Sequence, residues 1–164
     1  MKTVCFSLLA ALLTVAWTSS VWGWQGRVVE IIDARTLLVE TADRKVGVSL
    51  YGLGVPEDTE PFGEQALKAL QEWALGQEVQ MEGPPPPGSE VSGVVVVAQS
   101  GRNLNESLLK NGLAWVWEAT CERAVLCGRW ERLQGRAKAA NNGFWTIVPE
   151  NRPPWKWLRE QGGQ

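Results

Sequence analysis

Apolar and polar residues alternate along much of residues 24–99, a pattern typical of β-strands that bury one face. Apolar and β-branched residues are concentrated in five stretches, which we expect to form five strands: 24–32, 36–41, 45–52, 78–83 and 91–99. Prolines 84–87 separate the last two. Because proline cannot donate to a β-ladder, this run predicts a stiff, exposed loop. A polyproline ligand for a partner protein is the alternative interpretation.

Helical signals occur in three segments, at 59–73, shortly after residue 103, and at 129–140. Thr59 is a candidate N-cap for the first helix, and Pro61 falls in its first turn. Asn103 and Glu106 resemble a capping box for the second, and Gly112 follows its end. The pattern therefore predicts one α+β domain, a small closed barrel with appended helices.

The first residues have the pattern of a secretory signal peptide. Lys2 precedes an apolar run, and Val21 and Gly23 suit the −3 and −1 positions of a cleavage site. The alternative is an uncleaved membrane anchor, but the apolar run is shorter than the roughly 20 residues that span a bilayer. We therefore expect a signal peptide at 1–23 and a single exported domain at 24–164, periplasmic or extracellular, with no membrane span after cleavage.

The charge balance bears on possible partners. The chain has 16 basic and 18 acidic residues and no histidine, a formal charge of −2; without Lys2 the charge is −3. Nucleic-acid-binding proteins usually present a basic patch to phosphates. Nucleic acid is therefore a disfavoured partner, and the expected partner is an unknown protein or an oligomeric ligand.

Two cysteines remain after the predicted cleavage, Cys121 and Cys127. In an oxidising compartment, such a pair favours a disulfide. A metal site built on two cysteines needs further ligands, and the absence of histidine makes this alternative weaker.

Tryptophan is unusually frequent, with ten residues in the chain. We expect most of those after residue 23 to fill the core: Trp73, Trp115, Trp117, Trp130 and Trp145. Trp155 and Trp157 lie in a Pro/Trp-rich C-terminal tail, which should pack back on the domain. These two are candidate ligand contacts, because exposed indoles stack on bases or sugars.

Several sequence segments resemble motifs of the staphylococcal nuclease-like (thermonuclease) family and occur in the same order. "VVEIIDART" resembles its strand followed by Asp-Gly-Asp-Thr, and "VSLYGLGVPE" its Val-Arg-Leu-x-Gly-Ile-Asp-Ala/Thr-Pro-Glu. "PFGEQALKAL" is similar to its Tyr-Gly-x-Glu-Ala helix, and "GRNLNESLLKNGLAWV" to its Asn-Glu-containing segment. The cysteine pair and "PPWKW" resemble secreted bacterial members. The resemblance implies a five-stranded OB-type β-barrel with about three helices.

The resemblance also implies where a nuclease site would lie. Members of the family hold a calcium ion with two aspartates, beside a glutamate and two arginines. The aspartate positions fall on Arg35 and Gly54, and the arginine positions on Ser49 and Ser92. Only the glutamate is retained, at Glu57. Calcium needs several oxygen ligands, so no metal or other cofactor is expected.

Three functions remain open at this point. The leading hypothesis is an exported binding or interaction module without nuclease activity. The first alternative is a divalent-cation-dependent nuclease of DNA or RNA with displaced metal ligands, for example Asp33, Asp58 and Glu60. Of the three hypotheses, only this one requires calcium. The second is a structural partner in an envelope complex. Whether the chain is an enzyme is therefore uncertain, and the substitutions favour the view that it is not.

Overall fold

The structure is a computed structural model that describes residues 23–83, 86–149 and 154–162. The expected signal peptide lies outside these residues except for Gly23, and so do two of the four prolines, Pro84 and Pro85. Arg44 donates to the backbone oxygens of Pro86 and, at 3.2 Å, of Pro87. The described end of the proline run is therefore fixed to the neighbouring hairpin. Among the described helices, none has the length and apolar character to cross a membrane.

The five predicted strands are present, and the last is divided in two. They are β1 (Trp24–Asp33), β2 (Thr36–Glu40), β3 (Lys45–Leu50), β5 (Glu78–Met81), and β6 (Glu90–Gly93) with β7 (Val95–Val97). Three two-residue strands add to them: β4 (Leu53–Gly54), β8 (Arg102–Asn103) and β9 (Trp115–Val116). Along β2 and β3 every second residue is buried, as the alternation predicts.

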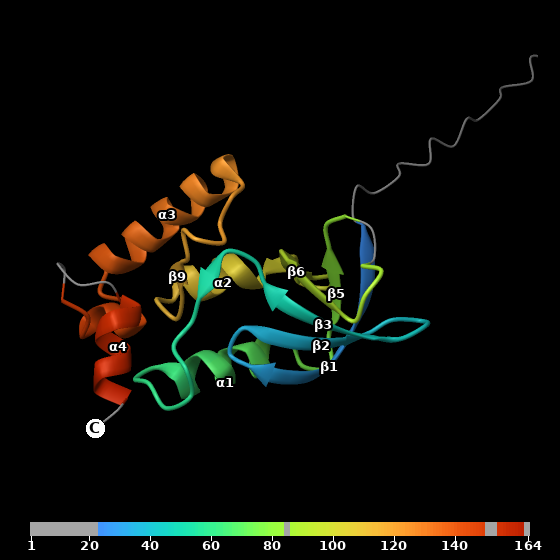
Figure 1. Ribbon diagram of the computed structural model, residues 1–164, viewed down its shortest axis with the longest axis horizontal. Helices are drawn as coiled ribbons and strands as arrows, with labels where there is room; N and C mark the ends of the chain where they lie inside the picture. The colour runs from blue at the N-terminus through green and yellow to red at the C-terminus, as the bar shows by residue number, and fades with distance from the viewer. Residues whose placement is uncertain (1–22, 84–85, 150–153, 163–164) are drawn as a thin grey trace, which may run out of the picture.

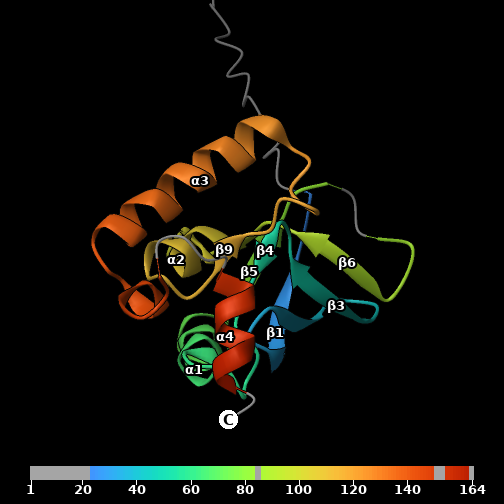
Figure 2. The same ribbon diagram turned by 60° about the vertical axis from the view of Figure 1, so that its left-hand side comes forward.

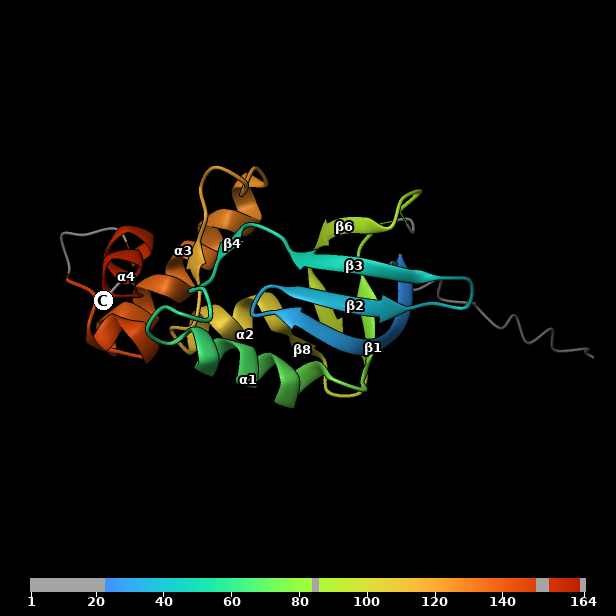
Figure 3. The same ribbon diagram turned by 60° about the horizontal axis from the view of Figure 1, so that its bottom comes forward.

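The divided strand closes the barrel. The main sheet has the order β6-β3-β2-β1-β5-β7-β8, so β6 pairs with β3 at one edge, while β7 pairs with β5 near the other. Because only Val94 separates β6 from β7, the two edges are joined by one bent segment. β1 is long and irregular in register and pairs with both β2 and β5. Figure 3 shows β1, β2 and β3 side by side around this barrel.

The helices are α1 (Gly63–Ala74), α2 (Leu104–Lys110), α3 (Ala124–Ala139) and α4 (Pro154–Gly162), with a 3-10 helix, η1 (Gly143–Thr146). The described part of the chain thus has four α-helices where about three were expected, because the tail itself forms α4. In Figure 1, α3 and α4 lie at the end of the barrel away from the hairpin between β2 and β3. The α+β barrel predicted from the sequence is confirmed.

Two predicted helix starts are wrong. Thr59 does not cap α1, which begins four residues later, after Phe62 in the left-handed region (φ 70°). The cause is a turn: the Glu60 carboxylate accepts a hydrogen bond from the Glu57 N–H at 2.8 Å, and the Gly63 N–H donates to the Glu60 carbonyl. The third helix begins at Ala124 rather than near 129, directly after the loop of the cysteine pair.

The cysteine pair and the N-cap at Asn103 are both confirmed. Cys121 and Cys127 form a disulfide with a Cα–Cα distance of 5.9 Å. Asn103 accepts a hydrogen bond from the Glu106 N–H at 3.0 Å at the start of α2, but the Glu106 carboxylate accepts from Lys110 at 3.3 Å and does not complete the capping box. Gly112 follows that helix with φ 62°, a conformation that favours glycine.

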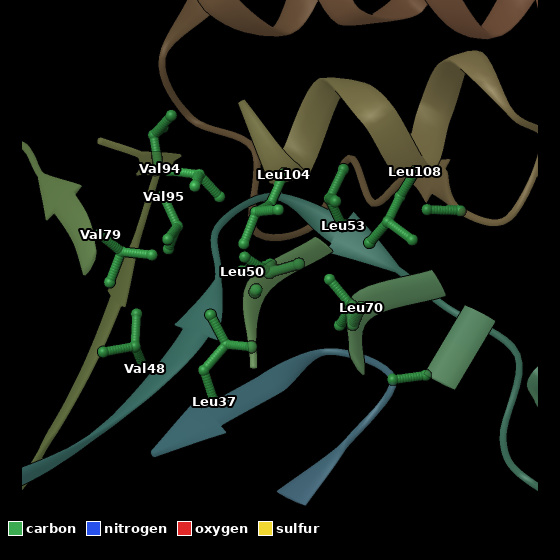
Figure 4. Close-up of a cluster of buried hydrophobic side chains, with 14 of the residues drawn as sticks. Leu37, Val48, Leu50, Leu53, Leu70, Val79, Val94, Val95, Leu104 and Leu108 are labelled. Atoms are coloured by element: carbon green, nitrogen blue, oxygen red, sulfur yellow. The ribbon is translucent and has the colours of Figure 1, made fainter. Parts of the chain in front are cut away.

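The main core lies between the barrel and helices α1 and α2 (Figure 4). Its fully or almost fully buried side chains come from both layers: Leu37, Val48, Leu50, Leu53, Leu70, Leu104 and Leu108. One polar residue, Asn105, is also completely buried there. Its side chain accepts from the Val95 N–H at 3.1 Å and donates to the Tyr51 carbonyl at 3.1 Å. Asn105 therefore ties α2 to the bent strand that closes the barrel.

A second, smaller core fixes the C-terminal tail. Leu158 of α4 is fully buried with side chains from β9, α3 and η1, among them Trp115, Phe144 and Trp145. The prediction that the tail packs back on the domain is confirmed. Of the five tryptophans expected in the core, three are buried (Trp115, Trp130 and Trp145) and two, Trp73 and Trp117, are half-buried.

Candidate functional site

A pocket of about 580 Å³ opens where the turn after β1, strand β4, strand β9 and helix α4 meet. It is lined by residues 33–35 and 54–60 together with Trp115, Trp117, Trp155 and Arg159. Figure 2 shows α4 below β4 and β9, and its residues Trp155 and Arg159 line the pocket, so the C-terminal helix forms one wall. The pocket therefore depends on segments from both halves of the sequence.

Three of the five positions carried over from the nuclease family line this pocket: Arg35, Gly54 and Glu57. The two arginine positions do not. Ser49 and Ser92 are Cα partners in the parallel pairing of β3 and β6. The fold thus places the two serines side by side on the barrel surface, as it would place the two arginines, but neither hydroxyl can provide the charged, bidentate grip of a guanidinium on phosphate.

Gly54 cannot be replaced by a metal-binding aspartate without rearrangement. Gly54 and Trp115 are register partners across the β4–β9 pair, and the indole covers the glycine. A Cβ added at residue 54 would lie 2.2 Å from Trp115 Cε2 and 2.3 Å from its Nε1, far inside contact distance. Trp115 is only 4 % exposed, so the ring has little room to move. The space for one family carboxylate is therefore filled by indole.

The other metal position also does not fit a cation. Arg35 is exposed at the pocket, and its guanidinium brings a permanent positive charge to the place of the second aspartate. Calcium takes six to eight oxygen ligands, usually including several carboxylates. Within residues 23–83, 86–149 and 154–162, no group of three or more acidic, cysteine or histidine side chains is arranged to hold a metal ion. The residues of this site thus do not fit the family's calcium.

The four acidic side chains of the pocket divide into two kinds. Asp33 and Glu60 are engaged with the backbone, since they accept from the N–H groups of Arg35 and Glu57 at 2.7 and 2.8 Å. Glu57 and Asp58 are exposed, and neither has a side-chain hydrogen bond or ion pair in the described part of the chain. The retained glutamate therefore points to solvent and forms no ion pair with Arg35.

The C-terminal helix adds two residues to the pocket. Trp155 and Arg159 are four residues apart on α4 and so share one face of the helix, while Leu158 anchors it in the second core. The Trp155 ring packs edge-on against Trp117, with centroids 5.2 Å apart, and at 6.2 Å from Trp115. Of the two candidate ligand contacts, Trp155 thus lines the pocket, whereas Trp157 packs half-buried against the second core.

Sequence reasoning missed Trp115, Trp117 and Arg159 as pocket residues. Both tryptophans are expected in the core because aromatic side chains are commonly buried, and Trp115 is indeed buried although it also lines the pocket. Arg159 lies about 100 residues from Glu57 in the chain, and only the docking of α4 brings them to one pocket. The "PPWKW" phrase was the available signal, because proline at the first turn of a helix predicts α4.

Comparison with known proteins agrees with this geometry. Residues 42–147 match the family described as staphylococcal nuclease homologue. The chain belongs to this family. The matched range includes β3, β4, the turn at Glu57 and β9, but ends before α4. The helix that supplies Trp155 and Arg159 therefore lies outside the matched range.

Relatives within the staphylococcal nuclease family bear nuclease names. A probable staphylococcal-like nuclease of Oryza sativa subsp. japonica is 32 % identical over 74 % of this chain, and the match covers 31 % of its own length. The chain spans about a third of the length of the first relatives that it matches, which also include an uncharacterized 38.1 kDa protein of Capnoides sempervirens. A micrococcal nuclease of Shigella flexneri is 27 % identical over 97 % of this chain and 96 % of its own. An uncharacterized endonuclease of Escherichia coli O157:H7 is 26 % identical over 80 % of this chain.

Proposed function

We propose that this protein is an exported binding module built on the staphylococcal nuclease fold, without calcium-dependent hydrolysis of phosphodiester bonds. The observation that carries the proposal is the indole of Trp115 over Gly54, which fills the place of a metal-binding carboxylate. Export is supported by the signal-like pattern of residues 1–23 and by the disulfide, since disulfides persist in oxidising compartments.

The chemistry of phosphodiester hydrolysis explains why these changes matter. The reaction needs a positioned water and strong stabilisation of the charge that develops on the phosphate oxygens. Glu57 could orient a water, but both arginine positions are serines and the calcium ligands are absent. Removal of a single charge-stabilising donor costs about 10²–10³-fold in rate, and here several are replaced together.

The direct test is hydrolysis of single-stranded DNA and of RNA by the purified protein, with calcium and with a chelator. We expect no chelator-sensitive cleavage. The Shigella flexneri micrococcal nuclease serves as the positive control, and Glu57→Gln as the matched variant. Cleavage by the wild-type protein that requires calcium and disappears in Glu57→Gln would show that the protein is a nuclease with displaced ligands.

A further inference from the structure

The pocket at α4 has one aromatic wall. Trp115, Trp117 and Trp155 are in mutual contact, with ring centroids between 5.2 and 6.3 Å apart. These are packing distances for aromatic pairs, so the three rings form one aromatic cluster at the pocket. Trp155 keeps 37 % of its surface exposed, and Trp117 is half-buried. The wall therefore offers indole surface on which a flat, partly apolar ligand can stack.

The pocket lining also carries hydrogen-bonding groups of both kinds. Glu57 and Asp58 offer carboxylate oxygens that accept hydrogen bonds, and Arg35 and Arg159 offer guanidinium groups that donate them. None of these four side chains has a hydrogen bond or ion pair within the described residues. Their hydrogen-bonding capacity is therefore available to a ligand.

The charges disfavour a polyanion in this pocket. Four carboxylates line it, at Asp33, Glu57, Asp58 and Glu60, against the two guanidinium groups of Arg35 and Arg159. A phosphodiester chain would meet this acidic surplus without a metal ion to offset it. A ligand with many hydroxyl groups needs no net charge, because each hydroxyl both donates to a carboxylate and accepts from a guanidinium.

We propose that this pocket binds a neutral oligosaccharide, with sugar rings stacked on Trp155 and Trp117 and their hydroxyls bonded to Glu57, Asp58 and Arg159. The inference rests on the proposed function, which leaves the site free of metal and of catalysis. Its volume of about 580 Å³ is in the range of small-molecule sites, about 300–1,000 Å³, and is consistent with part of an oligomer. OB-type barrels as a class bind oligosaccharides as well as oligonucleotides.

The probes are three neutral hexasaccharides: the β-1,4 and α-1,4 hexamers of glucose and the β-1,4 hexamer of N-acetylglucosamine. Each is titrated into the full-length protein by calorimetry and by tryptophan fluorescence, beside single-stranded oligothymidylate and spermine. We expect saturable binding of at least one hexasaccharide. Because the ligand is uncharged, its affinity should change by less than about twofold between roughly 50 and 200 mM salt, whereas nucleic-acid binding falls steeply over this range.

Helix α4 provides a charge-matched pair of variants. Arg159→Ala and Lys156→Ala each remove one exposed cation from the same helix, but only Arg159 lines the pocket. Arg159→Ala and Trp155→Ala should each weaken hexasaccharide binding by at least about tenfold, the effect expected from loss of a charged hydrogen bond or of a stacking ring. Lys156→Ala should bind as the wild type does. Within the described residues Arg159 forms no hydrogen bond or ion pair, so the effect of Arg159→Ala reports on the pocket.

The outcomes separate this inference from the proposed function. The inference is overturned if none of the three hexasaccharides binds at millimolar concentration. It is also overturned if hexasaccharide binding survives Arg159→Ala and Trp155→Ala, or if only oligothymidylate or spermine binds. Each of those results leaves a binding module without hydrolytic activity intact. Calcium-dependent cleavage of nucleic acid, in contrast, overturns the proposed function whatever the sugar titrations show.

Discussion

Trp115 lies opposite Gly54 in the β4–β9 pair, and its indole covers the glycine Cα so closely that a Cβ would lie 2.2 Å from the ring. An aromatic side chain over a strand glycine replaces the packing that the glycine lacks. In this protein the arrangement also occupies the position that the sequence resemblance assigns to one carboxylate of the family's metal site. The two residues should therefore be energetically coupled.

Gly54→Asp should lower the free energy of unfolding by about 2–4 kcal/mol, because it forces Trp115 aside and buries a charge. Trp115→Ala alone should cost about 3–5 kcal/mol. The double variant should be roughly 1–3 kcal/mol more stable than the sum of the two effects predicts, because the smaller residue makes room for the aspartate. Urea unfolding measures all three.

The matched control for this cycle is Gly88→Asp. Gly88 is exposed, and an added Cβ there has no neighbour within 4 Å. This substitution should change stability by about 0.5 kcal/mol or less. Strict additivity of Gly54→Asp and Trp115→Ala would mean that the indole is free to move, and would contradict the steric argument.

Calcium should not raise the melting temperature of the wild-type protein. A ligand that binds only the native state must stabilise it by mass action. Arg35 and Gly54 stand at the metal positions, so no binding is expected at millimolar calcium. A saturable upward shift in scanning calorimetry that is lost in Glu57→Gln would instead show a rebuilt site that uses the retained glutamate.

Asn105→Ala should be one of the most destabilising polar substitutions, at about 3 kcal/mol. It leaves the Val95 N–H and the Tyr51 carbonyl without their partner in a fully buried place. Asn111→Ala is the control, because Asn111 is exposed at the end of α2 and should cost about 0.5 kcal/mol or less. Equal losses for the two variants in chemical denaturation would show that Asn105 does not hold the barrel closed.

Loss of the disulfide should cost about 2 kcal/mol. The sequence separation between Cys121 and Cys127 is six, so the bond closes a short loop and restricts the unfolded chain only modestly. Replacement of both cysteines by serine should lower the unfolding free energy by this amount. Thiol titration of the unreduced protein without residues 1–23 should detect no free thiol, and two reactive thiols would refute the bond.

The sequence predicted the parts of the fold that depend on local pattern. The alternation in β2 and β3 and the N-cap at Asn103 are local signals, and the structure confirms them. The start of α1 depends instead on a side chain, because the Glu60 carboxylate binds the Glu57 N–H and holds a turn where Thr59 was expected to cap. Helix propensity and capping preferences, which are properties of the local sequence, do not predict such a side-chain contact.

The candidate site was only partly predictable for the same reason. The family phrases identified Arg35, Gly54 and Glu57, and the structure brings all three to one pocket. Arg159 reaches that pocket only because Leu158 is buried in the second core, which is a tertiary contact between segments far apart in the chain. The burial of Trp115 against Gly54 likewise follows from strand pairing, which the sequence does not specify by itself.

The bent strand β6–β7 also determines how late in folding the sheet loses its open edges. β3 obtains its second neighbour only when residues 90–93 pair with it, and β5 only when residues 95–97 do. Until then the sheet has two open edges, each able to pair with another unfolded chain. Ordering of the short segment from Glu90 to Val97 therefore ends the period in which folding chains are most exposed to aggregation, and a variant in which this segment docks slowly should aggregate more readily.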